Sequence, residues 1–296
     1  MRILFPHKLR ATWKVCRRKV SPHTEKIGFG LLVVLMVVWF YSPLPTVAAR
    51  YVWEHYRAGS FALLLDRSDA GLALAIGDYY FGNDPTTSSR EHPYDPSLAK
   101  KAAEKAIRIN PSVEYAHYMR ARVDFVQANF DESLTELNKE FSLFPDRKRT
   151  LYMRGLVYAY RGKERDLSLA EKDFQAFITW APTEWAGYND LAFVFAKEKK
   201  YDFAVTVLKE GIIKANGGAT NPWLWNALGV MELNLNKPAP ALASLIKAQR
   251  FATALTDVQW QRAYPGNNPL SAQAGLEAMQ VGIARNVIKA YAALEK

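Results

Sequence analysis

Residues 222–255 read PWLWNALGVMELNLNKPAPALASLIKAQRFATAL, a stretch in which large and small apolar residues recur every three or four positions. This spacing places them on one face of a helix and predicts two helices in the stretch. Gly229 and Ala241 are small enough to let the two helices approach closely. Trp225, Leu228 and Leu245 are bulky and fill the layer between one such unit and the next.

The same pattern repeats along the chain. Pro111 and Pro145 each follow a helix-like run and lie 34 residues apart, and Pro182 lies 37 residues further on. The aligned units occupy residues 70–111, 114–147, 148–182, 185–218 and 222–255. The first unit is degenerate, and the third needs three extra residues between its helices. A repeat of this period predicts a stack of identical supersecondary units.

In its spacing of bulky, small and proline residues the chain resembles the tetratricopeptide repeat family, whose 34-residue units each form two antiparallel helices. The resemblance covers about 185 residues of the chain. It implies an all-α fold, a right-handed solenoid of helical hairpins, with a connecting segment and a capping helix in residues 256–296. Unit 114–147 departs from the pattern, because Arg120 and Asp124 stand where apolar residues are expected.

Proteins of this family bind other proteins in a groove lined by the first helix of each unit. Carried over by position, the implied groove residues are Tyr115, Tyr118, Arg122, Arg149, Tyr152, Tyr160, Asn189, Phe193, Trp223 and Asn226. Tyr, Trp and Arg dominate binding hot spots, and Asn pairs with peptide backbone. Packing between repeats is the alternative role for the aromatic residues. The set that grips a carboxylate in one subclass is missing, since Tyr118 and Tyr152 occupy its positions.

The N-terminus has a different character. Residues 1–26 hold eight Lys/Arg and one acid, so they carry +7 of the total charge of +10. Residues 27–49 contain no charged side chain and are long enough for one N-terminal transmembrane helix. The basic flank then predicts a single-pass membrane protein, with a cytoplasmic N-terminus and the solenoid on the periplasmic or extracytoplasmic side. Residues 50–69 are expected to form a juxtamembrane helix, either interfacial or capping the solenoid.

An uncleaved signal anchor is one interpretation of this leader, and a secretory signal cleaved after Ala48 or Ala49 is another. A buried core helix and a mitochondrial targeting leader are further alternatives. Cys16 is the one cysteine of the chain, so no disulfide is expected, and its lipidation is left open.

The chain shows no constellation of catalytic residues. None of its five histidines has metal-ligand spacing, and residues 27–296 carry 31 basic against 28 acidic side chains. We therefore expect no enzyme activity, cofactor, metal site, nucleic-acid partner or small-molecule substrate. The sequence favours a membrane-tethered scaffold that binds a protein or peptide segment in its groove during assembly of a bacterial envelope complex. The alternatives are an obligate structural subunit of a larger membrane complex and a protein resembling organelle import receptors.

Overall fold

The computed structural model describes residues 42–81, 93–264 and 267–295, together with Phe29, Val33, Val34 and Met36. Within these ranges the regular elements are all helical, so the predicted all-α class is confirmed. The chain divides into two compact units, residues 1–67 and 68–296.

In the first unit, α2 (Leu44–Tyr56) packs against α3 (Gly59–Leu65). Pro45, Ala49 and Trp53 recur every four residues along α2 and form its buried face. The helix ends where Arg57 adopts a left-handed backbone conformation, with φ of 50°. Residues 50–69 therefore contain the end of one helix and the whole of a second.

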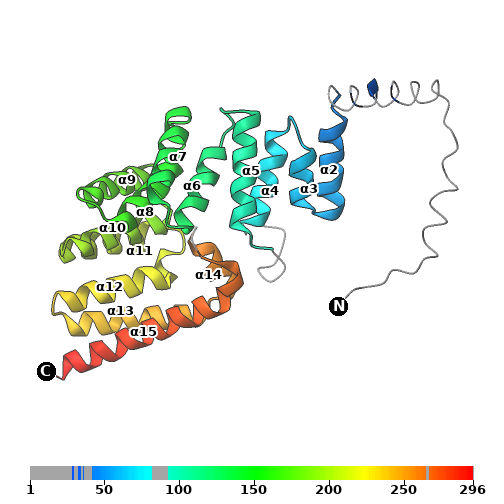
Figure 1. The fold of residues 1–296 in the computed structure, drawn as a ribbon. Coiled ribbons are helices and arrows are strands. Elements are labelled where there is room, and N and C mark those ends of the chain that lie inside the picture. The colour runs from blue at the N-terminus through cyan, green and yellow to red at the C-terminus, as the bar shows by residue number, and fades with distance from the viewer. Residues whose placement is uncertain are drawn as a thin grey trace, which may run out of the picture. The chain divides into compact units, whose positions relative to one another are not determined.

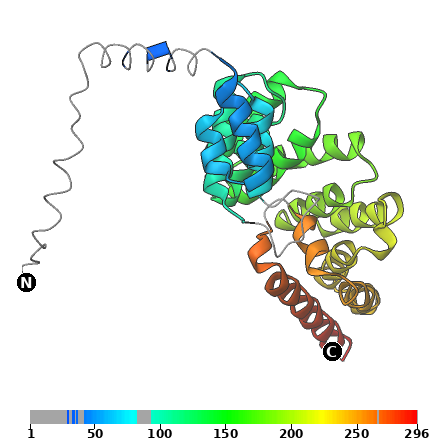
Figure 2. The same ribbon diagram turned by 90° about the vertical axis from the view of Figure 1, so that its right-hand side faces the viewer.

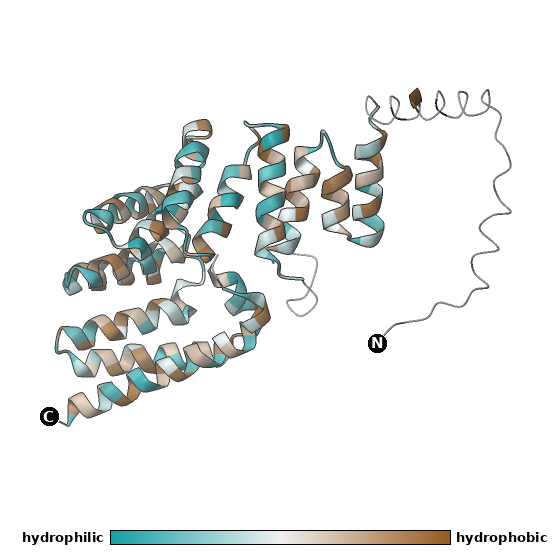
Figure 3. Ribbon diagram, viewed as in Figure 1, coloured by the Kyte–Doolittle hydropathy of each residue, from teal (hydrophilic) through white to brown (hydrophobic). Residues whose placement is uncertain are grey.

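The prediction of a single-pass membrane protein is wrong. No helix in the described part of the chain is long and apolar enough to cross a bilayer. Figure 3 shows hydrophilic residues on α2 and on most of the other helices labelled in Figure 1. Most of residues 27–41 of the predicted span lie outside the described residues, which here are limited to Phe29, Val33, Val34 and Met36. Its end, residues 44–49, belongs to α2, which begins after Pro43 and runs on through Arg50 and Glu54.

The second unit is a series of antiparallel helix pairs followed by two more helices (Figures 1 and 2). The pairs are α4 (Ala70–Tyr80) with α5 (Pro96–Ile109), α6 (Ala116–Val126) with α7 (Phe130–Leu143), α8 (Arg149–Arg161) with α9 (Asp166–Trp180), α10 (Trp185–Lys197) with α11 (Tyr201–Lys214), and α12 (Pro222–Asn234) with α13 (Pro238–Ala252). The short turn η2 (Gly218–Thr220) precedes α12, whereas α14 (Asp257–Ala263) and the turn η3 (Pro269–Ser271) precede α15 (Ala272–Leu294). The last helix packs along α13.

One backbone feature recurs in the turns inside four of these pairs. Ala128, Gly162, Lys199 and Asn236 occupy the same position of successive units, and all have φ between 55° and 67°. A left-handed residue at this point ends the first helix and redirects the chain into the second. The structure thus repeats in its backbone where the side chains differ.

Close helix approach in the pairs depends on small residues. A Cβ atom at Gly155 would lie 2.8 Å from the Phe174 ring, and one at Gly229 would lie 2.5 Å from Leu245 Cγ. Cβ atoms in proteins do not approach other carbon atoms this closely, so the facing large residue takes the space that the glycine leaves.

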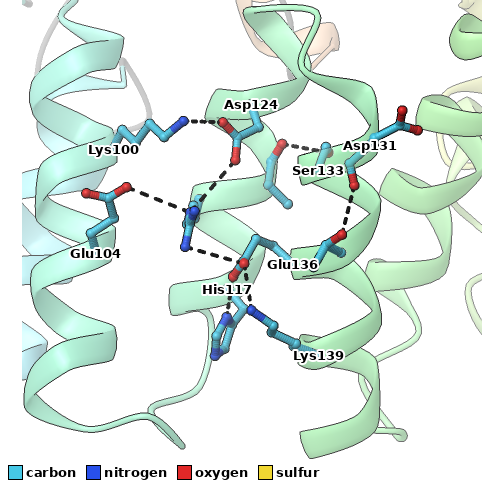
Figure 4. Close-up of polar contacts among 11 residues, drawn as sticks. Lys100, Glu104, His117, Asp124, Asp131, Ser133, Glu136 and Lys139 are labelled. Atoms are coloured by element: carbon cyan, nitrogen blue, oxygen red, sulfur yellow. Dashed lines mark hydrogen bonds and ion pairs between the residues drawn. The ribbon is translucent and has the colours of Figure 1, made fainter.

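The charged residues of unit 114–147 form a buried cluster between α5, α6 and α7 (Figure 4). Lys100 Nζ lies 2.5 Å from Asp124 Oδ1, and Arg120 Nη1 lies 3.4 Å from Glu136 Oε1. Glu136 also contacts His117 Nδ1 and Lys139 Nζ. Opposite charges pair inside the cluster because buried charges are tolerated only when compensated.

Candidate binding groove

Two cavities adjoin on the surface formed by the first helices of three consecutive pairs, α6, α8 and α10. The larger cavity is about 480 Å³ and the smaller about 400 Å³. Tyr264 and Asn267, which follow α14, line both cavities. This surface, consisting of the two cavities and the residues that line them, is termed the groove.

Tyr115 stands at the entrance of α6 in an unusual backbone conformation, with φ of 77°. Its amide donates to Glu140 Oε1 at 2.8 Å, which holds the strained residue in place. Its hydroxyl accepts a hydrogen bond from Arg122 Nη1 at 3.1 Å and donates to Asp78 Oδ1 at 3.4 Å. Burial raises the pKa of Tyr115 to about 12, so the phenol stays protonated.

The larger cavity carries more positive than negative charge. Among the described residues, its lining includes Arg122, Arg149 and Arg262 but only one carboxylate, Glu184, which lies 3.7 Å from Arg149. Arg122 is buried, and its guanidinium lies 4.7 Å from the centre of the Phe81 ring. Such a lining favours acidic or aromatic groups in a ligand.

A buried carboxylate lies at the boundary between the cavities. Asp190 accepts hydrogen bonds from Tyr152 Oη at 2.8 Å, Asn189 Nδ2 at 3.2 Å and Tyr264 Oη at 3.3 Å. Burial raises the pKa of this carboxyl to about 6, although the three donors oppose the shift. The hydroxyl of Tyr264 also accepts from Asn189 Nδ2 at 2.7 Å.

Aromatic rings continue across the groove. The Tyr264 ring meets Trp185 edge to face at 5.5 Å, and Trp185 stacks on Trp223 at 5.0 Å. In the smaller cavity Tyr160 lies between Phe125 and Phe193, with ring centres 5.5 and 6.1 Å apart. Tyr160 and Phe193 are 58% and 39% exposed, so part of this row faces solvent.

Comparisons with known proteins bear on the fold. No family model matches the chain. Outer dynein arm-docking complex subunit 4 of Xenopus laevis is 28% identical over 103 residues, which make up 35% of this chain and only 18% of that protein. A tetratricopeptide repeat protein from Parabacteroides merdae superposes with a TM-score of 0.51 at 14% identity, covering 92% of this chain and 89% of that one. PilW, a type IV pilus biogenesis factor, gives a TM-score of 0.51 at 17% identity over 76% and 92% of the two chains.

The fold is a tetratricopeptide-repeat-like solenoid. At these identities the structural likeness establishes only the arrangement of the helices. It says nothing about which side chains line the groove or what they bind.

The solenoid brings most of the sequence-predicted groove residues together. The larger cavity is lined by Tyr115, Tyr118, Arg122, Arg149 and Tyr152, and the smaller by Tyr160, Asn189 and Phe193. Trp223 lies against Trp185, outside the residues that line either cavity, and Asn226 Oδ1 accepts from Asn286 of α15 at 3.0 Å. The role of the ten residues in binding stays a prediction.

Asp190, Trp185 and Tyr264 are among the groove residues that are absent from the sequence-based set. Asp190 and Trp185 lie at repeat positions that the resemblance does not assign to the groove, and Tyr264 lies beyond the last repeat. A carboxylate beside Asn189 in an otherwise apolar helix was the available signal for Asp190. Tyr264 had no comparable signal, because its place depends on the path of the chain after α13.

Proposed function

We propose that the groove binds a segment of another protein and that the chain acts as a scaffold in a protein assembly. The observation that carries this proposal is the convergence of arginine and aromatic side chains from α6, α8 and α10 on two adjoining cavities. A surface built on three rigid helix pairs is preformed, which limits the entropy lost on binding.

The chemistry of the lining supports a protein ligand. Tyr160 and Phe193 offer exposed aromatic area next to a polar floor, and Arg149 offers an exposed charge at the edge of the larger cavity. Aromatic and arginine anchors of this kind supply most of the affinity in protein interfaces.

The proposal is tested by site-specific photocrosslinking in cells that produce the full chain. Benzoylphenylalanine replaces Phe193 in the groove or, as a matched control, Phe203 on α11, which is exposed at 62% and lies outside the two groove cavities. We expect a defined protein adduct from position 193 that disappears when Arg149 and Tyr160 are changed to alanine. An adduct that forms only from position 203 contradicts groove binding.

A second candidate is a structural subunit held through its outer helices. It is favoured by α11, on which Phe203 and Ile213 are 62% and 81% exposed. In that case the partner is crosslinked from position 203, and the groove substitutions leave the adduct unchanged.

A further inference from the structure

Tyr264 occupies the groove although it comes from outside the repeats. Its ring lies against Trp185, and its hydroxyl both accepts from Asn189 and donates to Asp190. A phenol hydroxyl has one proton to donate and lone pairs that accept, so it satisfies both neighbours at once. Trp185, Asn189 and Asp190 therefore form a seat that fits a tyrosine side chain; these three residues are termed the tyrosine seat.

Helix α14, which precedes Tyr264 in the chain, also contacts the C-terminal helix α15. Thr256 and Gln259 form a reciprocal capping box at the start of α14. The indole ring of Trp260 lies so close to α15 that a Cβ atom at Gly275 would overlap it. Asn267 Nδ2 donates to the Trp260 carbonyl at 2.6 Å and closes the turn that carries Tyr264. Anchoring of α14 is thus shared between the C-terminal helix and the tyrosine seat.

We propose that Tyr264 is an internal ligand of the groove and that the partner segment carries a tyrosine which takes its place in the seat. This inference rests on the proposed function, because it names the kind of segment that the groove recognises. A partner that fills both cavities must pass the position of Tyr264, since this residue lines both of them.

The seat selects tyrosine over other aromatic residues for a physical reason. Asp190 is buried, and a phenylalanine in the seat removes one of the three hydrogen bonds to its carboxylate. Sites that are built to bond a hydroxyl reject the analogue that lacks it, because the buried polar groups are left unpaired. Displacement of one tyrosine by another keeps every one of these bonds.

The test uses a peptide taken from the segment of this chain that carries Tyr264. A fluorescein-labelled synthetic peptide of residues 256–270 is titrated by fluorescence anisotropy against the full wild-type chain and against Tyr264→Ala. We expect the peptide to bind the variant about tenfold more tightly than the wild type, because the variant has no side chain in the seat. The same peptide with phenylalanine in place of Tyr264 is expected to bind the variant about tenfold more weakly than the native peptide. Equal affinities for the two proteins, or for the two peptides, overturn the proposal.

A second measurement covers the case in which Tyr264→Ala fails to fold. Hydrogen exchange of the α14 amides is compared between the wild type and Tyr264→Phe, which keeps the ring and removes the hydroxyl. Faster exchange in α14, with unchanged exchange in α12 and α13, supports the proposal that the Tyr264 hydroxyl holds α14 at the tyrosine seat. Unchanged exchange in α14 overturns it. A wild-type dimer that dissociates on Tyr264→Phe also overturns the proposal, since the seat is then filled by a second copy of the chain.

The failure of this inference is distinguishable from failure of the proposed function. A partner crosslinked from position 193 whose affinity does not change in Tyr264→Ala leaves groove binding intact and removes the internal ligand. A partner crosslinked only from position 203 removes groove binding, while the peptide titration still decides whether the seat takes a tyrosine.

Discussion

The hydroxyl of Tyr152 on α8 donates a 2.8 Å hydrogen bond to Asp190 Oδ2 on α10, so two neighbouring helix pairs are joined through a buried carboxylate on the floor of the groove. Asn189 and Tyr264 complete the set of donors around this carboxylate. The floor of the groove is therefore both a junction between repeats and a polar recognition element.

Asp190 makes the stability of the chain depend on pH. Its pKa is about 6 in the folded chain and 3.8 ordinarily, so between these values the folded chain binds more protons than the unfolded chain. The free energy of unfolding consequently falls as the pH rises through this window, by about 3 kcal/mol. In Asp190→Asn this fall is absent. Urea unfolding at pH 4, 5, 6 and 7 measures the difference between the two proteins.

Asp166 provides a control of opposite sign. Arg161 donates to it through Nε and Nη2 and lowers its pKa, so its contribution to stability is present above the ordinary pKa and is lost as the pH falls. Asp166→Asn is expected to flatten the acid side of the profile instead. The same pH response in both variants would contradict the assignment to Asp190.

Gly229 is required by helix packing. Gly229→Ala places a methyl group 2.5 Å from Leu245 Cγ and is expected to lower the free energy of unfolding by about 2 kcal/mol. Gly282→Ala on α15 is the matched control, because a Cβ atom at this position meets no neighbouring atom within 4 Å. It is expected to raise stability by about 0.5 kcal/mol through helix propensity. Urea denaturation followed by circular dichroism compares them, and equal effects would refute close packing at Gly229.

Ala128 carries backbone strain that a glycine does not have. Its φ is 60°, and it is exposed, so Ala128→Gly removes an unfavourable Cβ contact without loss of buried area. We expect Ala128→Gly to raise the free energy of unfolding by about 0.5 kcal/mol, after the greater entropy of glycine in the unfolded chain is included. Ala243 is an exposed position in α13, and Ala243→Gly is expected to lower the free energy of unfolding by about 1 kcal/mol. Thermal unfolding that shows the same sign for both substitutions would argue against a strained turn.

The charged cluster of α5, α6 and α7 depends on Glu136. Glu136→Ala leaves His117, Arg120 and Lys139 without their shared carboxylate. We expect this substitution to lower the free energy of unfolding by about 3 kcal/mol. Glu210→Ala breaks an exposed pair with Lys214 and is expected to change stability very little. Similar losses in the two variants would show that the buried cluster contributes no more than a surface pair.

The all-helical solenoid was predictable because its requirements are local. Gly155, Gly229 and Ala241 mark points where helices touch, and this need appears in the sequence as a small residue at a fixed spacing. Arg120 and Asp124 were visible as departures from the pattern, but their compensation by Lys100 and Glu136 depends on how three helices meet.

The groove was predictable only in part. Residues on the first helices of the repeats follow from repeat position, and eight of the ten predicted ones line the two cavities. Tyr264 returns to the groove from beyond the last repeat, which no periodicity encodes. The predicted membrane span was based on hydropathy from residue 27 to 49. Its end belongs to α2, which begins after Pro43 and buries Ala49, and hydropathy alone does not show this.

The most direct test of groove binding is the affinity of the crosslinked partner, measured by isothermal titration calorimetry against three forms of the full chain. The double substitution Tyr160→Ala with Phe193→Ala is expected to weaken binding about 30-fold, since two exposed aromatic anchors are removed. Phe203→Ala is expected to leave the affinity at the wild-type value. A groove variant that binds as tightly as the wild type, with weakened binding by Phe203→Ala, would show that the partner is held on the outer helices instead.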